Sequence, residues 1–362
     1  MVNPCPPRAF EKRIAGRRVL VTGHTGFKGG WLSLWLTALG CDVSGLALSP
    51  STTPNLFDAA RVGNHVKSTI GDIRDPKLVR DAVEANRPEV IFHLAAQPLV
   101  SRSFGEPLAT FATNTLGTSH VLDAATSVPG VLAVVCVTTD KVYVDRGWPW
   151  GYRETDTLGG KDPYSASKAA AELVALCYRN SVAARGNECA IATARGGNVI
   201  GGGDWSEDRI VTDFYRAVTQ GTTLTLRRPD AIRPWQHVLT LAHGYIALAD
   251  GLIAGDAAAA DAWNFGPGEH DAVRVGTLVD RLADQWARPP IECAAPTFPE
   301  THYLRIDSAK ARNQLGWSPA LDFEGAVRLT ADWYKSYCDD ASAAERITAE
   351  QIDVYRRSLD DA

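Results

Sequence analysis

Long apolar runs are missing from this chain of 362 residues. No stretch reaches the roughly 18 apolar residues that a membrane-spanning helix needs, which argues against an integral membrane protein. The opening segment MVNPCPPRAF also lacks the apolar core of a secretory signal, so we expect a cytoplasmic protein. A surplus of positive charge is missing too. The net charge of −5 argues against a nucleic-acid partner, since phosphate binding normally calls for a basic face.

Paired cysteines are also missing, because no two of the seven cysteines form a CxxC motif. They stand at Cys5, Cys41, Cys136, Cys177, Cys189, Cys293 and Cys338. The odd count and the scattered spacing favour free thiols in a reducing compartment. They also argue against a zinc site, and we expect no bound metal.

Short apolar segments alternate with helical patterns over the first 195 or so residues. Strands are expected at 17–22, 42–48, 66–70, 89–94, 131–137 and 189–194. Helices are expected at 30–39, with Gly40 as C-cap, and at 77–85, 107–125 and 164–180. The pattern predicts an α/β fold with a Rossmann-type, doubly wound parallel sheet. The almost wholly apolar 131–137 segment fits a sheet that is covered on both faces.

The character of the chain changes after Arg195, where a glycine-rich segment at 196–203 reads as a loop. We therefore predict a dinucleotide-binding domain over 1–195, which 237–262 rejoins. A smaller mixed α/β substrate domain is expected over 196–335. The tail at 336–362 carries charged residues at helical spacing and predicts an exposed helix.

A glycine loop joins the first strand to the first helix. Its glycines are Gly23, Gly26 and Gly29, with Thr25 and Phe27 between them. Such a loop lets the backbone approach a pyrophosphate, which the N-terminus of the helix would also attract. The spacing is GxxGxxG, and a plain tight turn is the alternative.

Other strand ends suggest further cofactor contacts. The Asp72-Ile73 pair follows the third strand, where the carboxylate could reach an adenine amino group or simply cap a turn. The Ala95-Ala96-Gln97 segment is compact enough for backbone to pass near a ribose or nicotinamide. The second strand ends near Ser49 without an acidic residue and without an arginine for a 2′-phosphate. The sequence therefore favours NAD over NADP.

Two side-chain pairs predict proton chemistry. Tyr164 and Lys168 are four apart and share one face of a helix. A nearby ammonium would lower the pKa of the phenol, so that Tyr164 could act as a general base. The Thr139-Asp140-Lys141 triplet adds a second acid–base pair, which suggests chemistry beyond hydride transfer. A solvated lysine at a strand end is the alternative for Lys141.

These motifs together resemble the extended short-chain dehydrogenase/reductase family. Within it, the chain is most similar to the branch that dehydrates CDP-glucose, from about residue 16 to about residue 335. That closer likeness rests on five segments: GHTGFKGGWL at 23–32, TDKVY at 139–143, WGYRE at 150–154, GGNVIGGGDW at 196–205 and RPWQHV at 233–238.

The resemblance implies conversion of CDP-D-glucose to CDP-4-dehydro-6-deoxy-D-glucose and water, with NAD recycled in each turnover. Tyr164 would take the C4 hydroxyl proton, with Lys168 holding its charge and Thr139 bonded to the C4 oxygen. Asp140 would protonate the departing C6 hydroxyl, and Lys141 would remove the C5 proton. Burial would have to outweigh the attraction between Asp140 and Lys141 for both roles to hold.

The resemblance also implies the binding residues. Substrate contacts are expected at Asn198, Arg209, Arg233, Asn264 and Arg305, and a further cofactor contact at Asn114. Arg233 and Arg305 suit a diphosphate, whereas Asn198, Arg209 and Asn264 could instead make loop hydrogen bonds. Trp148, Trp150 and Tyr152 could line the sugar pocket or pack in the core.

A homodimer formed through helices 107–125 and 164–180 is implied as well, and a place in deoxysugar synthesis for lipopolysaccharide O-antigen. Rival interpretations are a nucleotide-sugar 4-epimerase, a 4,6-dehydratase acting on another NDP-hexose, and a dinucleotide-binding regulator without catalysis. The epimerase has no use for Asp140 and Lys141, and the regulator has no use for Tyr164 and Lys168.

Overall fold

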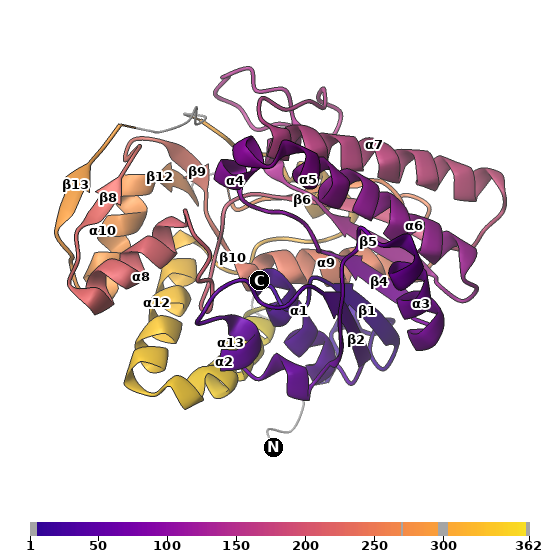
Figure 1. Ribbon diagram of the computed structural model, residues 1–362, viewed down its shortest axis with the longest axis horizontal. Coiled ribbons are helices and arrows are strands. Elements are labelled where there is room, and N and C mark those ends of the chain that lie inside the picture. The colour runs from indigo at the N-terminus through magenta and orange to yellow at the C-terminus, as the bar shows by residue number, and fades with distance from the viewer. Residues whose placement is uncertain (1–5, 269–270, 296–302, 360–362) are drawn as a thin grey trace.

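A seven-stranded parallel sheet forms the centre of the computed structural model, which describes residues 6–268, 271–295 and 303–359 (Figure 1). Its strands are β1 (Arg18–Thr22), β2 (Asp42–Ala47), β3 (Lys67–Ile70), β4 (Val90–His93), β5 (Ala133–Val137), β6 (Ala190–Gly196) and β11 (Ala262–Phe265). They lie in the order β11-β6-β5-β4-β1-β2-β3, and every neighbouring pair is parallel. The order reverses between β1 and β4, which confirms the predicted doubly wound α/β fold.

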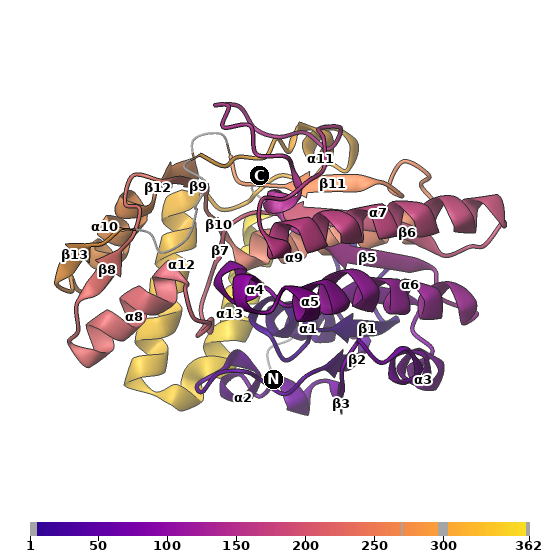
Figure 2. The ribbon, with the colours of Figure 1, turned by 45° about the horizontal axis from the view of Figure 1, so that its top comes forward.

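Helices cover both faces of this sheet (Figure 2). One face packs against α3 (Pro76–Asn86), α6 (Gly117–Ser127) and α7 (Pro163–Ala184), and the other against α1 (Phe27–Ala38) and α9 (Val238–Ile253). Successive residues of a strand enter opposite cores: Val19 and Val21 lie in one buried cluster and Leu20 in the other. The apolar runs in the sequence follow from this double coverage.

The predicted helix over 107–125 contains a widened turn. It consists of α5 (Pro107–Phe111), a π-helical turn (Ala112–Leu116) and α6. The turn carries Asn114, whose amide nitrogen donates to the Gln97 carbonyl at 3.1 Å and to the Ser167 hydroxyl at 2.9 Å. The widened turn thereby joins a strand-end loop to α7, and such turns are frequent at functional sites.

Beyond β6 the chain builds a smaller part beside the sheet. Its elements are β7 (Val199–Ile200), α8 (Ile210–Gln220), β8 (Leu224–Leu226), β9 (Ile232–Pro234), β10 (Gln236–His237), β12 (Ala272–Arg274), α10 (Val275–Gln285) and β13 (Ile291–Cys293). Strand β7 lies inside the segment predicted to be a loop, because it pairs with β10. The chain returns through α9 to the sheet, where β11 lies beside β6. The division into domains stays a prediction.

Short elements complete the described part. They are the helices α2 (Leu56–Ala59), α4 (Val100–Gly105) and α11 (Ala309–Gln314) and the 3-10 turns Ala9–Glu11, Val62–Asn64, Asp140–Val142 and Ala341–Ala343. None of the described helices combines the length and the apolar character needed to span a bilayer. Within the same residues, no three His, Cys, Asp or Glu side chains meet as they would around a metal ion. Six of the cysteines are free thiols, and Cys5 lies outside the described residues.

The expectation of an exposed tail helix is wrong. Helix α12 (Phe323–Asp339) is followed by α13 (Ala344–Ser358), and α13 packs against α1. Tyr355 is fully buried with its ring 5.6 Å from that of Trp35, and the Arg356 guanidinium pairs with Glu11 at 2.9 Å. The charged residues concealed this packing, because Arg356 is neutralised by a carboxylate near the other end of the chain.

Candidate active site

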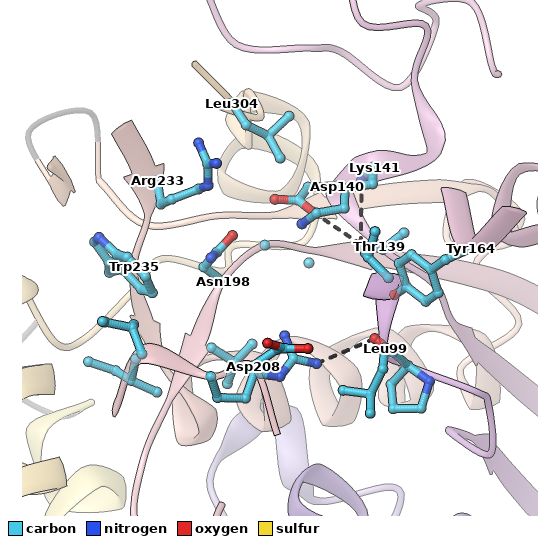
Figure 3. Close-up of a pocket in the computed structure, with 18 of the residues that line it drawn as sticks. Leu99, Thr139, Asp140, Lys141, Tyr164, Asn198, Asp208, Arg233, Trp235 and Leu304 are labelled. Carbon is cyan, nitrogen blue, oxygen red and sulfur yellow. Dashed lines mark hydrogen bonds and ion pairs between the residues drawn. The ribbon is translucent and has the colours of Figure 1, made fainter. Parts of the chain in front are cut away.

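A cavity of about 530 Å³ opens where the carboxyl ends of β5 and β6 meet the smaller part of the fold. Figure 3 shows Thr139, Asp140 and Tyr164 on one side of it and Arg233 and Trp235 on the other. The structure therefore brings most of the predicted catalytic and substrate residues together. Those that line the cavity are Thr139, Asp140, Lys141, Tyr164, Asn198, Arg209 and Arg233.

The predicted acid–base triplet forms a tight turn directly after β5. Thr139 caps this turn, since its hydroxyl accepts from the Lys141 backbone N–H at 3.4 Å and donates to Asp140 Oδ1 at 3.0 Å. Lys141 Nζ donates to the same Oδ1 at 3.3 Å. Asp140 Oδ2 is buried and has no hydrogen-bond partner among the described residues. A proton on this carboxyl group therefore belongs on Oδ2, since Oδ1 already accepts two donors.

Tyr164 and Lys168 lie on the first turns of α7. Asp162 caps this helix by accepting from the Ser165 N–H at 2.9 Å, and Pro163 starts it. Lys168 Nζ donates to the Val137 carbonyl at 3.1 Å, which ties the lysine to the end of β5. The Tyr164 hydroxyl shares a hydrogen bond with Thr139. Both side chains are almost completely buried.

The predicted fall in the pKa of Tyr164 is wrong. Burial raises the pKa of this phenol, and this effect outweighs the opposing effects of the Thr139 hydrogen bond and the Arg209 charge. Burial also lowers the pKa of Lys168 to about 8, and the charge of Lys28 adds to the effect. The spacing of the pair was informative, but the sequence could not show how strongly both groups are desolvated.

The glycine loop has the geometry of a dinucleotide cradle. Gly23 has a φ of +80°, and a Cβ there would lie 2.8 Å from the Ala95 backbone nitrogen. A Cβ on Gly29 would collide with the Gly23 carbonyl oxygen. Thr25 Oγ1 donates to the Leu48 carbonyl at 2.8 Å. The N-cap of α1 is Gly26, which has no side chain to cap the helix, so the backbone N–H groups of the first turn fit a pyrophosphate.

The other predicted cofactor residues follow β3 and β4 or lie on the π-helical turn. Asp72 accepts hydrogen bonds from the Arg74 guanidinium, which holds the pKa of the carboxyl group below its usual range. Ile73 is buried against Gly117. The Ala95-Ala96-Gln97 segment is fixed by hydrogen bonds, since the Ala95 N–H donates to Thr22 at 3.2 Å and the Gln97 N–H to Asn114 Oδ1 at 2.8 Å. Asn114 thus supports the strand-end segment, and its contact with a cofactor stays a prediction.

Two predicted substrate residues lie outside the cavity lining. The amide of fully buried Asn264 accepts from the Tyr143 hydroxyl at 2.7 Å and donates to the Tyr152 carbonyl at 2.9 Å. Direct contact between Asn264 and a substrate is therefore not supported, because the amide is already committed to protein groups. Arg305 donates to the Tyr303 hydroxyl at 3.2 Å.

Trp148, Trp150 and Tyr152 were expected either to line the sugar pocket or to pack in the core, and the three residues differ in this respect. Tyr152 lines the cavity and stacks on Tyr143, with ring centres 5.1 Å apart. Trp148 packs against Tyr152 at 5.4 Å without lining the cavity, and Trp150 is exposed. Only Tyr152 among these three residues is placed to touch a sugar.

Several residues of this region have no role in the expectations drawn from the sequence. Lys28 lines the cavity, and burial together with the Arg209 charge lowers the pKa of Lys28 to about 8. A lysine in the first turn of a helix opposes the helix dipole, and this signal could have drawn attention to it. The buried pair formed by Glu172 and Arg195 gave no comparable signal, because it depends on the packing of α7 against β6.

Comparisons with known proteins agree with this geometry. Residues 20–330 match the family model described as GDP-mannose 4,6 dehydratase. A CDP-glucose 4,6-dehydratase of Salmonella typhimurium is 44% identical over 328 residues, which cover 89% of this chain and 91% of that protein. A dTDP-glucose 4,6-dehydratase of Streptomyces antibioticus is 32% identical over 73% of this chain and 75% of its own length.

Solved structures agree as well. DesIV, a dTDP-glucose 4,6-dehydratase from Streptomyces venezuelae with NAD and TYD bound, superimposes with a TM-score of 0.73 and 26% identity. The match covers 91% of this chain and 99% of that one. A UDP-glucose 4-epimerase from Thermus thermophilus in complex with NAD gives a TM-score of 0.74 at 28% identity, over 88% of this chain and 99% of its own. The sequence match, the sheet and the cavity together place this chain in the GDP-mannose 4,6 dehydratase family.

Proposed function

We propose that the protein dehydrates CDP-D-glucose to CDP-4-dehydro-6-deoxy-D-glucose and water, with NAD as a recycled cofactor. The observation that carries the proposal is the meeting of Asp140, Lys141 and Tyr164 in one cavity, with Lys168 buried behind it on the same helix as Tyr164. A simple alcohol dehydrogenase or a 4-epimerase needs only Tyr164 and Lys168. The likeness to the Salmonella typhimurium enzyme supports CDP as the nucleotide.

The cofactor would be held by Gly23, Gly26 and Gly29 and by the start of α1, with Lys168 near its ribose. NAD would supply a hydride acceptor for C4 of the sugar and, later in the cycle, a hydride donor for C6. Tyr164 would remove the C4 hydroxyl proton, and Thr139 would bond to the C4 oxygen. The positive charge of Arg209 supports this step because it opposes the rise in the pKa of Tyr164 that burial causes.

Asp140 and Lys141 would carry the elimination. The ketone formed at C4 acidifies the C5 proton, and Lys141 would take that proton. The electrons of the broken C5–H bond form the C5–C6 double bond, and the C6–O bond breaks as Asp140 donates its proton to the leaving hydroxyl. The free Oδ2 of Asp140 is suited to carry this proton. Arg233 would bind the diphosphate.

Side-by-side turnover with CDP-, TDP-, UDP- and GDP-glucose tests this proposal. The expected result is release of water and a 4-keto-6-deoxy product, fastest from CDP-glucose. Inversion at C4 without loss of water would identify a 4-epimerase instead. Faster turnover of TDP-glucose would overturn the assignment of the base while keeping the reaction, and absence of any reaction would favour the non-catalytic dinucleotide-binding regulator.

We also propose a homodimer formed through α5, α6 and α7. These helices lie side by side in Figures 1 and 2 and carry exposed apolar side chains. Leu108 on α5 is 85% exposed, and Leu116 on the π-helical turn and Leu173 and Leu176 on α7 are exposed as well. A second copy of the same helices would cover this surface as a four-helix contact.

The free thiols suit a cytoplasmic enzyme. The resemblance also suggests a place in deoxysugar synthesis for lipopolysaccharide O-antigen.

A further inference from the structure

A buried ion pair lies beneath the Thr139–Lys141 turn and has no part in the proposed chemistry. Arg195 Nη2 is 2.7 Å from Glu172 Oε2, and the side chains are 4% and 2% exposed. Arg195 belongs to β6, and Glu172 lies on α7, one turn beyond Lys168. Because a buried ion pair is a weak source of net stability, the groups that it holds in place matter more.

The Glu172–Arg195 pair is hydrogen-bonded to Thr138 and Tyr143, which lie on either side of the Thr139–Lys141 turn. On the upstream side, the Thr138 hydroxyl donates to Glu172 Oε1. On the downstream side, Arg195 Nη1 donates to the Tyr143 hydroxyl at 2.9 Å, and this hydroxyl donates in turn to Asn264 Oδ1 at 2.7 Å.

The carboxylate itself is held firmly. Glu172 Oε2 accepts from Thr193 Oγ1 at 2.7 Å in addition to Arg195. The charge of Arg195 and these hydrogen bonds keep the pKa of Glu172 below its usual range despite burial. Glu172 is therefore an ionised anchor for the turn, and its several hydrogen bonds fix its position more closely than one bond would.

Helix α7 carries Tyr164 and Lys168 as well as Glu172. The Glu172–Arg195 ion pair therefore connects this helix to the turn that carries Asp140 and Lys141. We propose that Glu172 and Arg195 are positioning residues that hold Asp140 and Lys141 in register with Tyr164 and Lys168. This inference rests on the proposed function. Tyr164 and Lys168 are fixed by α7 itself, whereas the turn at 139–142 depends on its flanks. Weakening the anchor should therefore slow the elimination more than the oxidation.

Thr138→Val tests the upstream bond, since valine has nearly the shape of threonine but no hydroxyl. Thr138→Ser is the matched control, because it keeps the donor to Glu172. Rapid mixing of each holoenzyme with CDP-glucose would follow the absorbance of reduced nicotinamide. Product formation and deuterium uptake from solvent at C5 would be measured in parallel.

For Thr138→Val we expect product formation and C5 exchange to fall about tenfold or more, while the oxidation rate stays within about twofold of the wild type. Reduced nicotinamide should then accumulate, and Thr138→Ser should restore most of the rate. Equal loss of both steps, or loss of neither, would overturn the inference. If Thr138→Val does not fold, Tyr143→Phe removes the downstream bond and must give the same pattern.

A different result would refute the proposed function. Wild-type protein that neither reduces the cofactor nor releases water with any of the four nucleotide sugars would refute both. Wild-type turnover combined with an equal loss of both steps in the variants would refute only the positioning role of Glu172 and Arg195.

Discussion

The two carboxylate oxygens of Asp140 have different surroundings, and this difference decides which oxygen would carry the proton in the proposed elimination. Oδ1 accepts hydrogen bonds from Thr139 and Lys141, whereas Oδ2 faces Gly197 without a partner among the described side chains. A Cβ on Gly197 would lie 2.9 Å from Oδ2 and 2.8 Å from Pro234 Cγ. The missing side chain at position 197 therefore leaves space beside Oδ2, the oxygen to which the proposal assigns the proton.

Gly197→Ala should crowd this oxygen and slow dehydration. We expect kcat to fall about tenfold or more, with a loss of about 1–3 kcal/mol in the free energy of unfolding from overpacking. Steady-state kinetics and urea denaturation measure the two effects. Gly105→Ala is the matched control, because a Cβ there meets no atom within 4 Å. An unchanged kcat in Gly197→Ala would contradict the assignment of the proton to Oδ2.

The charge of Arg209 should be visible in the pH dependence of the oxidation. Because the charge of Arg209 opposes the rise that burial causes in the pKa of Tyr164, loss of this charge should raise that pKa further. The rising limb of kcat/KM, which reports loss of the phenol proton, should then move to higher pH in Arg209→Gln.

Arg209→Lys keeps the positive charge and should leave the limb nearly in place, even if substrate binding weakens in both variants. A rising limb that stays at the same pH in Arg209→Gln, or moves to lower pH, would show that Tyr164 is not the group that titrates.

At the scale of single elements, apolar pattern and turn chemistry allowed most of the sheet to be predicted. The apolar 131–137 segment predicts a covered strand, and its residues Ala133–Val137 form one. The C-cap of α1 is Leu39, and Gly40 follows it with a φ of +75°, so the helix ends one residue earlier than the assignment of Gly40 as C-cap implies. The π-helical turn at 112–116 escaped prediction, because widening one turn changes no residue type.

The site was predictable where it depends on local spacing and not where it depends on packing. Tyr164 and Lys168 are recognisable four residues apart on one helix. The Glu172–Arg195 pair requires α7 to lie against β6, and the pKa of Tyr164 requires its burial, which no local pattern reports. The prediction that Asn264 binds substrate rests on resemblance, and no local pattern shows that its hydrogen-bond partners Tyr143 and Tyr152 lie on distant segments.

Docking of α13 supplies a prediction for this element. Arg356→Met leaves the buried Glu11 carboxylate without the guanidinium that donates to both of its oxygens. Breaking such a pair should lower the free energy of unfolding by about 3–5 kcal/mol, as urea denaturation would measure. The double variant with Glu11→Gln should recover part of the loss, because it removes the unpaired charge. A single variant as stable as the wild type would show that the pair does not hold α13.

At the scale of the whole molecule, the exposed leucines of α5 and α7 predict the mode of assembly. Leu108→Glu or Leu173→Glu should convert a dimer to a monomer, because a charge cannot be buried there without a partner. Analytical ultracentrifugation measures the change. Val354→Glu is the control, since Val354 is exposed on α13, away from these helices. A monomeric wild type, or variants that remain dimeric, would contradict the proposed contact.

Because β11 comes late in the chain, the edge of β6 stays unpaired during part of biosynthesis. Strand β6 is complete at Gly196, but its neighbour begins only at Ala262. While the ribosome adds the intervening segment, the nascent chain exposes the backbone edge of β6, and an unpaired edge invites association with other chains. Cells that make this protein quickly must therefore shield that edge, so its yield in a foreign host should depend on chaperone supply and on slower growth at low temperature.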